Sequence, residues 1–414
     1  MVELLAPAGG FISLRAVLDS GADSVYIGLN DFNMRANANN FSINNLKEVS
    51  KIASDYYSKV YLCSNVLLKE EDINKFLSKL EDIASSNIDG VILADIGLIE
   101  EVRSHGLEAH ISVQENISNS YSLKALKKLG ASRAILSREL NISEIKEIAK
   151  KSPIETEIFI HGAMCMAISG RCFLSYGLYN RSANCGDCLQ PCRKEWILNF
   201  KEDKNDLVQN NFKLDNEEFI ISESFDDTYR TNFFSPKDLS MIEHIPEIIE
   251  SGVDAFKIEG RARSPDYAST AVKVYREAID SYLENKIKYK FNPKWNQELS
   301  KVFNRGFDTG FYFNIPYKTS EENQSKFIKK DIGKVVNYFS KIKVAELKIW
   351  DDISIGDEIM IQGKTTGSIN QIINSMEING EKIKKAKKGL NIAIAMDNKV
   401  RENDFVYKLI PRFD

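Results

Sequence analysis

The clearest candidates for chemistry in this chain are its cysteines. Five of the six fall in one short segment, with the spacing C-x6-C-x12-C-x2-C-x3-C: Cys165, Cys172, Cys185, Cys188 and Cys192. Thiolates are soft ligands, and four of them that converge can hold a zinc ion or an iron–sulfur cluster. This segment is therefore the first candidate for a working site.

Three chemistries compete for the cysteine segment. A four-cysteine zinc site usually pairs two short C-x-x-C knuckles, and only Cys185 and Cys188 have that spacing. Disulfides are disfavoured, because the first residues lack the basic start and apolar stretch of a signal peptide and we expect a cytoplasmic protein. A [4Fe–4S] cluster tolerates irregular spacing and is the leading interpretation. Spacing alone leaves open which of the five thiols is spare.

The secondary structure that positions this segment can be predicted from a simple alternation of apolar and amphipathic runs. Short apolar runs rich in β-formers alternate with longer amphipathic runs, such as Glu71–Ser86 and Ile142–Lys151. The eight apolar runs are Glu3–Ala6, Ser24–Ile27, Val60–Ser64, Gly90–Ala94, Ala109–Val113, Arg133–Leu136, Glu157–Ile160 and Ala255–Ile258. Eight strands that alternate with helices predict a (β/α)8, TIM-like barrel over residues 1–325, with the cysteine cluster at 165–192. A doubly wound open sheet is the alternative, although no glycine-rich phosphate fingerprint follows the first run.

Two stretches depart from this alternation. Residues 197–233 are polar, with a short strand candidate at 219–221, and we expect an inserted loop or hairpin. Residues 327–414 contain short strands separated by turn signals such as Asn379-Gly380, which predicts a small C-terminal antiparallel β-barrel. The basic segment 382–388 in this domain fits either a solvated loop or an RNA contact.

Polar residues gather just after the apolar runs. In a barrel these positions form the carboxyl-terminal rim, where active sites are built. They are Asn65, Asp95, Gln114, Arg138, Glu139, His161, Glu259 and Arg261. Any one of these residues could equally be a polar cap at the end of a strand. The presence of the whole group favours a functional site on the rim.

Charge and motifs exclude several classes of protein. The net charge is −4, so no global attraction draws the chain to nucleic acid, and an RNA partner needs a local basic patch. No run approaches the roughly 18 apolar residues that span a bilayer, and we expect neither a membrane nor DNA as a partner. The H-E-x-x-H zinc motif, the G-x-S-x-G elbow, the P-loop and the C-x3-C-x2-C radical motif are absent.

The cysteine segment and its surroundings resemble a known family. The stretches 157–165 and 169–175 closely resemble the signature of the peptidase U32 family. Further matches run through nearly the whole chain, at residues 4–9, 35–36, 110–114, 138–140, 190–193, 237–239 and 257–261. The family name and its collagenase-like members imply a protease. Its better understood members are iron–sulfur proteins that support hydroxylation, at a tRNA uridine or a 23S rRNA cytidine with prephenate implicated, or in ubiquinone synthesis.

The resemblance also implies a ligand set. The family pattern C-x6-C-x15-C-x3-C falls on Cys165, Cys172, Cys188 and Cys192. Cys185 is then an extra thiol, near a position where family members usually carry arginine. The implied cofactors are a [4Fe–4S] cluster and prephenate as a co-substrate.

We therefore expect an iron–sulfur-dependent enzyme that supports hydroxylation of a tRNA or rRNA base, with RNA and an electron donor or other protein as partners. The candidate catalytic residues are His161, Glu259, Arg138, Arg261 and Lys237, and the candidate substrate-binding residues are His110, Gln114, Arg35 and Asn65. Arg138 and Arg261 suit an anionic donor or phosphate, and His161 or Glu259 suits proton transfer. The alternatives are a U32-type peptidase and a non-catalytic iron–sulfur scaffold or redox partner.

Overall fold

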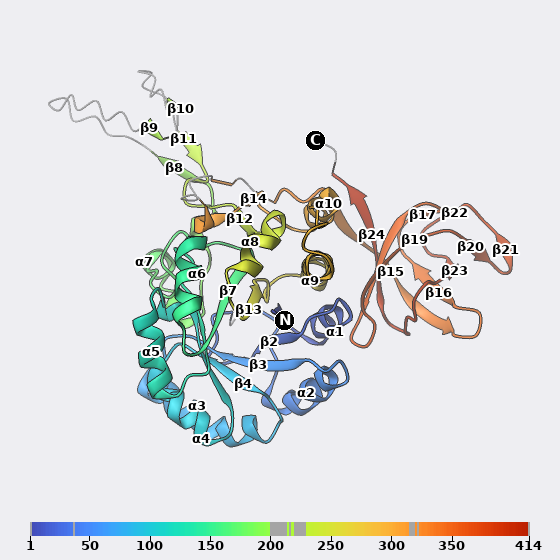
Figure 1. Ribbon diagram of the computed structural model, residues 1–414. Helices are drawn as coiled ribbons and strands as arrows, with labels where there is room; N and C mark the ends of the chain where they lie inside the picture. The colour runs from blue at the N-terminus through green and yellow to red at the C-terminus, as the bar shows by residue number, and fades with distance from the viewer. Residues whose placement is uncertain are drawn as a thin grey trace.

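The chain folds into a barrel followed by a β-sheet domain, as Figure 1 shows. The computed structural model describes residues 2–35, 38–198, 213–214, 217–218, 229–313, 319–320 and 323–412. The strand candidate at 219–221 lies outside these residues. No helix in the described ranges is both long enough and apolar enough to cross a membrane.

Eight parallel strands form a closed barrel. They are β1 (Glu3–Pro7), β2 (Ser24–Gly28), β3 (Lys59–Ser64), β4 (Gly90–Leu93), β5 (Glu108–Ile111), β6 (Arg133–Ile135), β7 (Glu155–Gly162) and β13 (Ala255–Ile258). Each strand pairs with the next, and β13 pairs with both β7 and β1, which closes the ring. The predicted (β/α)8 barrel is confirmed, and the open doubly wound sheet is excluded.

Helices cover the outside of the barrel (Figure 1). They are α1 (Phe11–Asp19), α2 (Leu46–Ser54), α3 (Glu70–Ala84), α4 (Ile99–Ser104), α5 (Ser120–Leu129), α6 (Ile142–Lys151), α8 (Ile245–Glu250) and α9 (Pro265–Glu284). Helix α6 shows why they form where they do. Asn141 caps its first turn by accepting hydrogen bonds from the backbone N–H groups of Ser143 and Glu144, and Ile145 and Ile148 are buried on its inner face.

Charged side chains fill the amino-terminal end of the barrel. Arg133, only 2% exposed, contacts Glu3 at 2.6 Å, Glu155 at 2.7 Å and Glu157 at 3.3 Å. Lys257 contacts the other oxygen of Glu157 at 2.8 Å. Because each buried charge has a partner of opposite sign, this end of the barrel is closed by ion pairs rather than left open for a ligand.

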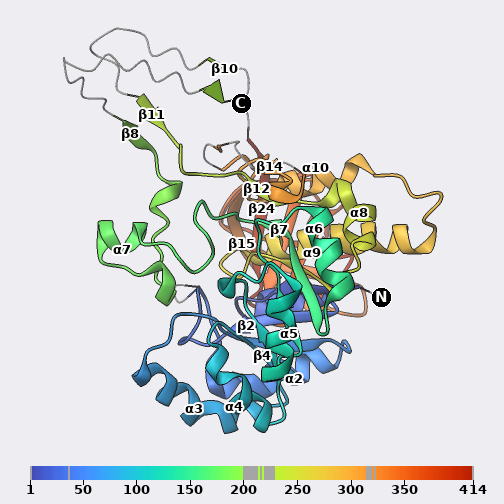
Figure 2. The same cartoon turned by 60° about the vertical axis from the view of Figure 1, so that its left-hand side comes forward.

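Additional elements extend the carboxyl-terminal side of the barrel. Strand β12 (Asp238–Ser240) pairs antiparallel with β7, and β14 (Phe307–Asp308) adds to β12. Strands β8 (Trp196–Leu198) and β11 (Tyr229–Thr231) pair antiparallel and project away from the barrel, as Figures 1 and 2 show. Helix α10 (Pro293–Lys301) follows α9 along the chain.

The last part of the chain is an antiparallel sheet with its own core. Its order is β19-β18-β24-β15-β16-β23-β20-β21. The strands are β15 (Phe327–Phe339), β16 (Val344–Ile349), β18 (Glu358–Gly363), β19 (Gly367–Ile372), β20 (Met376–Ile378), β21 (Glu381–Lys382), β23 (Asn391–Ala395) and β24 (Phe405–Pro411), and β17 (Ile353–Ser354) pairs separately with β22 (Lys385–Ala386). The antiparallel character agrees with the sequence prediction. Lys329 binds Asp266 of α9 at 3.0 Å, which ties this sheet to the barrel.

Candidate functional site

The cysteine segment lies over the carboxyl-terminal rim of the barrel. It begins where β7 ends at Gly162 and runs through α7 (Leu174–Tyr179), the 3-10 turn η4 (Ala183–Cys185) and the 3-10 turn η5 (Pro191–Arg193). Figure 2 shows α7 standing out from the barrel on the left. The segment therefore covers the end of the barrel at which TIM-barrel enzymes build their sites.

Hydrogen bonds from several barrel loops hold the segment in place. Arg138 donates to the carbonyl oxygen of Ala163 at 2.7 Å, and Asn116 donates to that of Ser169 at 3.1 Å. Asn184 accepts from the Cys172 N–H through its side chain at 3.1 Å and from the Leu67 N–H through its carbonyl at 2.9 Å. Arg193 donates to the carbonyl oxygens of Met164 and Pro236 and, at 3.0 Å, to the Ser235 hydroxyl. Hydrogen bonds therefore join the rim loops to the cysteine segment.

Four of the five clustered thiols influence one another electrostatically. Burial raises the pKa of Cys188 and Cys192, and the negative charges of Cys165 and Cys172 raise the pKa of both further. Cys185 is exposed and is not among the largest contributors to either shift. Within the described residues, no three Cys, His, Asp or Glu side chains are placed to hold a single metal ion.

Arg35 and Glu259 form an ion pair beside these thiols. The Arg35 guanidinium donates to a Glu259 carboxylate oxygen at 3.0 Å. Burial works to raise the pKa of Glu259, but the charges of Arg35, Arg263 and Arg138 outweigh it and hold this pKa below its usual range. Burial works to lower the pKa of Arg35, but the charges of Glu259 and Cys165 keep it raised. Glu259 is therefore an ionised carboxylate at neutral pH.

Arg261 crosses the mouth of the barrel from β13 towards β2. Its guanidinium donates to the Asn33 side chain, and its Nη1 is buried without a partner in the described residues. A Cβ atom at Gly28 would lie 1.7 Å from this Nη1, so only glycine leaves room for the guanidinium. Burial lowers the pKa of Arg261. An unsatisfied buried cation is costly, which marks this position as one where an anionic ligand would fit.

His161 lies among aromatic rings at the end of β7. Its ring centroid lies 5.8 Å from that of Tyr267, 5.5 Å from that of Tyr275 and 5.7 Å from that of Phe307. The side chain is 1% exposed, and its Nδ1 has no hydrogen-bond partner among the described residues. Burial lowers the pKa of His161 to about 4, against the opposing charge of Glu259. The imidazole is therefore neutral at pH 7.

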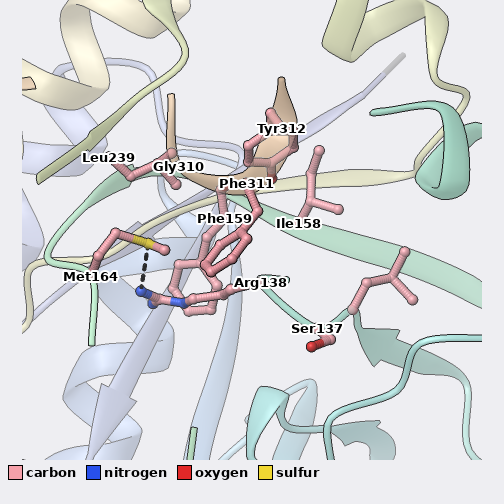
Figure 3. A pocket seen from close by; sticks show the side chains of 10 residues that line it. Ser137, Arg138, Ile158, Phe159, Met164, Leu239, Gly310, Phe311 and Tyr312 are labelled. Carbon is pink, nitrogen blue, oxygen red and sulfur yellow. Dashed lines mark hydrogen bonds between the residues drawn. The ribbon is translucent and has the colours of Figure 1, made fainter. Parts of the chain in front are cut away.

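Arg138 lines a small cavity between β6, β7 and the 3-10 turn η7 (Gly310–Tyr312), shown in Figure 3. Its guanidinium carbon lies 3.9 Å from the ring centroid of Phe159 and its Nη1 lies 3.6 Å from the sulfur of Met164. Because its Nη1 also holds the start of the cysteine segment, Arg138 acts as an anchor in this structure.

Asn65 and Gln114 lie together, and Lys237 lies on the added strand. Asn65 is 3.5 Å from the Ser112 hydroxyl, which in turn donates to Gln114. A Cβ at Gly170 would lie 2.8 Å from Gln114, so the cysteine segment packs closely on this residue. Lys237 is partly buried just before β12, whereas the other candidates lie within barrel strands or in the loops that follow them. The roles assigned to these residues stay predictions.

The structure corrects the expected placement of His110. Its side chain is fully buried and its Nε2 lies 2.9 Å from Glu108. It pairs in register with Arg133, the first residue of β6, and therefore belongs to the ion-paired amino-terminal layer. The strands of a barrel are staggered, so a residue late in one strand can lie level with the start of the next. His110 does not line the rim pocket.

A cavity of about 400 Å³ opens between the loops that follow β1 and β13. The first turns of α1 and α9 both face it, together with Arg261 and Arg263, and none of the residues that line it is Asp or Glu. Helix amino-termini and arginines attract anions, so this cavity is electrostatically suited to a negatively charged small molecule.

Two residues of the site were missed by sequence reasoning. Asn33 is 1% exposed and binds Arg261 and the Arg35 N–H, but it lies in the middle of a long loop where no pattern distinguishes it. Arg263 stacks on Phe303, with 3.8 Å between its guanidinium carbon and the ring centroid. Its position two residues after Arg261, beyond the end of β13, could have identified it by the same rule that identified the other rim residues.

A TIM-like barrel with a cysteine segment across its carboxyl-terminal rim defines the structural class. Residues 9–322 match the model of peptidase family U32, and the chain belongs to this family. It is 45% identical to an uncharacterized protease of Methanocaldococcus jannaschii, over 99% of this chain and 98% of that protein. It is 35% identical to a collagenase of Porphyromonas gingivalis, with the same coverage, and 33% identical to tRNA hydroxylation protein P1 of Bacillus subtilis, over 98% of this chain and 94% of that protein.

Proposed function

We propose that this protein is an enzyme that supports hydroxylation of an RNA base, most directly in tRNA, at an iron–sulfur cluster on the barrel rim. The proposal is carried by four thiols of one segment that lie within electrostatic reach of one another beside the Arg35–Glu259 pair. The near full-length similarity to a protein named for tRNA hydroxylation supplies the substrate class.

The donor set suits a [4Fe–4S] cluster bound by Cys165, Cys172, Cys188 and Cys192. These thiols lie within electrostatic reach of one another, yet no three of them in the described structure are drawn around a single ion. Their spacing, C-x6-C-x15-C-x3-C, contains no C-x-x-C knuckle, of which a four-cysteine zinc site usually has two, so the cluster is favoured over a zinc site. Such a cluster supplies electron transfer or a Lewis-acidic iron.

The surrounding residues suit distinct tasks. Arg35 balances the charge of nearby thiolates and keeps Glu259 ionised. The neutral imidazole of His161 has an unpartnered Nδ1 and would serve as a hydrogen-bonding group. Arg261 and Arg263, at the cavity that lacks acidic residues, would bind an anionic co-substrate of the prephenate type. RNA is the partner that this assignment requires.

Peptide hydrolysis is the second candidate, because two of the relatives are named as proteases. The described site offers little support for it. The Cys188 sulfur accepts a hydrogen bond from the Gln190 N–H, and His161 Nδ1 is unpartnered, so these two residues form no thiol–imidazole pair. A nucleophilic mechanism needs such a pair.

The test is complementation. The chain is expressed in an Escherichia coli strain that lacks its own tRNA hydroxylation protein P, and tRNA nucleosides are measured by mass spectrometry. Wild-type protein should restore the hydroxylated nucleoside, Cys188→Ser and Glu259→Gln should not, and Cys185→Ser should. The proposal fails if wild-type protein leaves the tRNA unmodified and the purified, metal-analysed protein cleaves gelatin instead.

A further inference from the structure

Large apolar side chains are exposed in unusual density on the cysteine segment. Among the described residues, 24 large hydrophobic side chains are exposed, and seven of these lie between residues 166 and 189. They are Met166, Ile168, Phe173, Tyr176, Leu178, Tyr179 and Leu189. Proteins usually scatter such side chains singly, so this density indicates a surface that another molecule covers.

Three of these side chains form an aromatic platform, which we define as Phe173, Tyr176 and Tyr179. Phe173 precedes α7 directly, and the two tyrosines follow at intervals of three residues, which places the three rings on one side of the helix. Their side chains are 73%, 53% and 48% exposed. Within the described residues, the three rings stack neither on one another nor on any other ring or cation, so each of them is open to a ligand.

The platform is held rigidly next to the thiols. Ser175, buried beneath it, accepts a hydrogen bond from the Leu189 N–H at 3.1 Å, which ties α7 to the residue after Cys188. Asn180 ends the helix in the left-handed conformation, at a φ of 53°, and donates its N–H to the Tyr176 carbonyl at 2.8 Å. A rigid aromatic surface loses little conformational entropy when it binds.

The charge around the platform favours a polyanion. Residues 163–196 carry four cationic side chains and two acidic ones, whereas the whole chain carries a net charge of −4. The cations are Arg171, Arg181, Arg193 and Lys194. Arg181 pairs with Asp187, and Arg171 is exposed directly before Cys172. Flat exposed rings beside arginine are the combination that proteins use to bind single-stranded nucleic acid.

We propose that the aromatic platform stacks unpaired bases of an RNA and holds the target nucleotide beside the cysteine site. Cys172 immediately precedes Phe173, so the platform begins one residue after a proposed ligand of the cluster. The inference rests on the proposed function and adds the surface that recognises the substrate. Stacking is tolerant of sequence, so the platform contributes affinity and placement while other contacts select the nucleotide.

The experiment measures RNA affinity with the full chain, purified anaerobically and analysed for iron. The probe is a fluorescein-labelled RNA stem-loop with an unpaired, uridine-rich loop, followed by fluorescence anisotropy. The variant Phe173→Ala/Tyr176→Ala/Tyr179→Ala should bind at least about tenfold more weakly, since each stacked base contributes roughly 5-fold to 150-fold in affinity. The salt dependence of binding should be unchanged, because no phosphate contact is removed.

Two controls separate stacking from a general surface effect. The variant Phe173→Tyr/Tyr176→Phe/Tyr179→Phe keeps three rings and should bind as wild type does. Tyr121→Ala removes an exposed tyrosine from α5, outside the cysteine segment, and should also leave affinity unchanged.

The possible outcomes distinguish failure of the platform assignment from failure of the proposed function. If the triple alanine variant keeps its iron and binds RNA as tightly as wild type, the platform assignment is overturned while the proposed function stands. If that variant instead loses a co-purifying redox protein with no change in RNA affinity, the surface is a protein interface. If wild-type protein itself shows no saturable RNA binding, the proposed function and the platform fall together.

Discussion

Arg35 and Glu259 meet across the mouth of the barrel at 3.0 Å, although they are separated by most of the barrel sequence. The Arg35 charge also acts on Cys188, and Cys165 is among the groups that raise the pKa of Arg35. One guanidinium therefore couples the last barrel strand to the cysteine segment. The pair therefore links the electrostatics of the barrel mouth to those of the thiols.

Replacing Arg35 should therefore affect both stability and activity. Arg35→Gln should lower the free energy of unfolding at pH 7 by about 1–3 kcal/mol, because it leaves the buried Glu259 carboxylate with weaker partners. The loss should shrink as the pH falls below about 4, where the unfolded chain's carboxyl groups become protonated and the advantage of a lowered pKa disappears. Urea unfolding measures the effect. Lys75→Gln, which breaks an exposed pair with Glu71, is the control and should leave the stability close to that of wild type.

A substitution at Gly28 tests the role of the Arg261 guanidinium in activity. Gly28→Ala should displace Nη1 and break its contact with Asn33, and the yield of hydroxylated nucleoside should fall at least about tenfold while the chain remains folded. Gly177→Ala is the matched control, since a Cβ there meets nothing within 4 Å. Equal activity of the two alanine variants would remove Arg261 from the proposed chemistry.

His161 should make stability dependent on pH. Its pKa is about 4 in the folded protein and about 6.5 in an unfolded chain, so between these values protons bind only the unfolded state. Stability from this residue is complete above about pH 6.5 and falls as the pH decreases. Between about pH 6.5 and 5, wild-type protein should lose about 1.5 kcal/mol more than His161→Phe in urea unfolding. His244→Gln controls for removal of a more exposed ring, and identical pH profiles for wild type and His161→Phe would contradict the assignment.

The amino-terminal end of the barrel should be structural. Arg133→Met leaves Glu157, which is fully buried, with Lys257 as its remaining cationic contact and should cost about 3–5 kcal/mol of unfolding free energy. Lys59→Gln, at an exposed pair with Glu108, should cost less than about 1 kcal/mol. A loss below about 1 kcal/mol for Arg133→Met would show that the ion-pair layer does not hold the barrel closed.

The barrel was predictable because each strand carries its own signal. All eight apolar runs became strands, and the amphipathic run Ile142–Lys151 became a helix with the expected bounds. Such local periodicity needs no knowledge of distant contacts. Strand β19, at one edge of the carboxyl-terminal sheet, was missed, because its largely polar sequence carries no comparable pattern.

The site was predictable only in part. Glu259 and Arg261 follow a strand and lie at the rim, as that position indicates. His110 also comes late in its strand, yet the stagger of the barrel places it beside the ion-paired layer. Asn33 reaches the site from a long loop. Which loop residues converge depends on how the barrel closes, and that arrangement is three-dimensional rather than local.

The most direct test of the central claim is iron and sulfide analysis of anaerobically purified protein. Wild type and Cys185→Ser should each hold about four irons and four sulfides per chain, and Cys192→Ser should hold much less of both. One zinc per chain without sulfide, or loss of iron in Cys185→Ser but not in Cys192→Ser, would contradict the account.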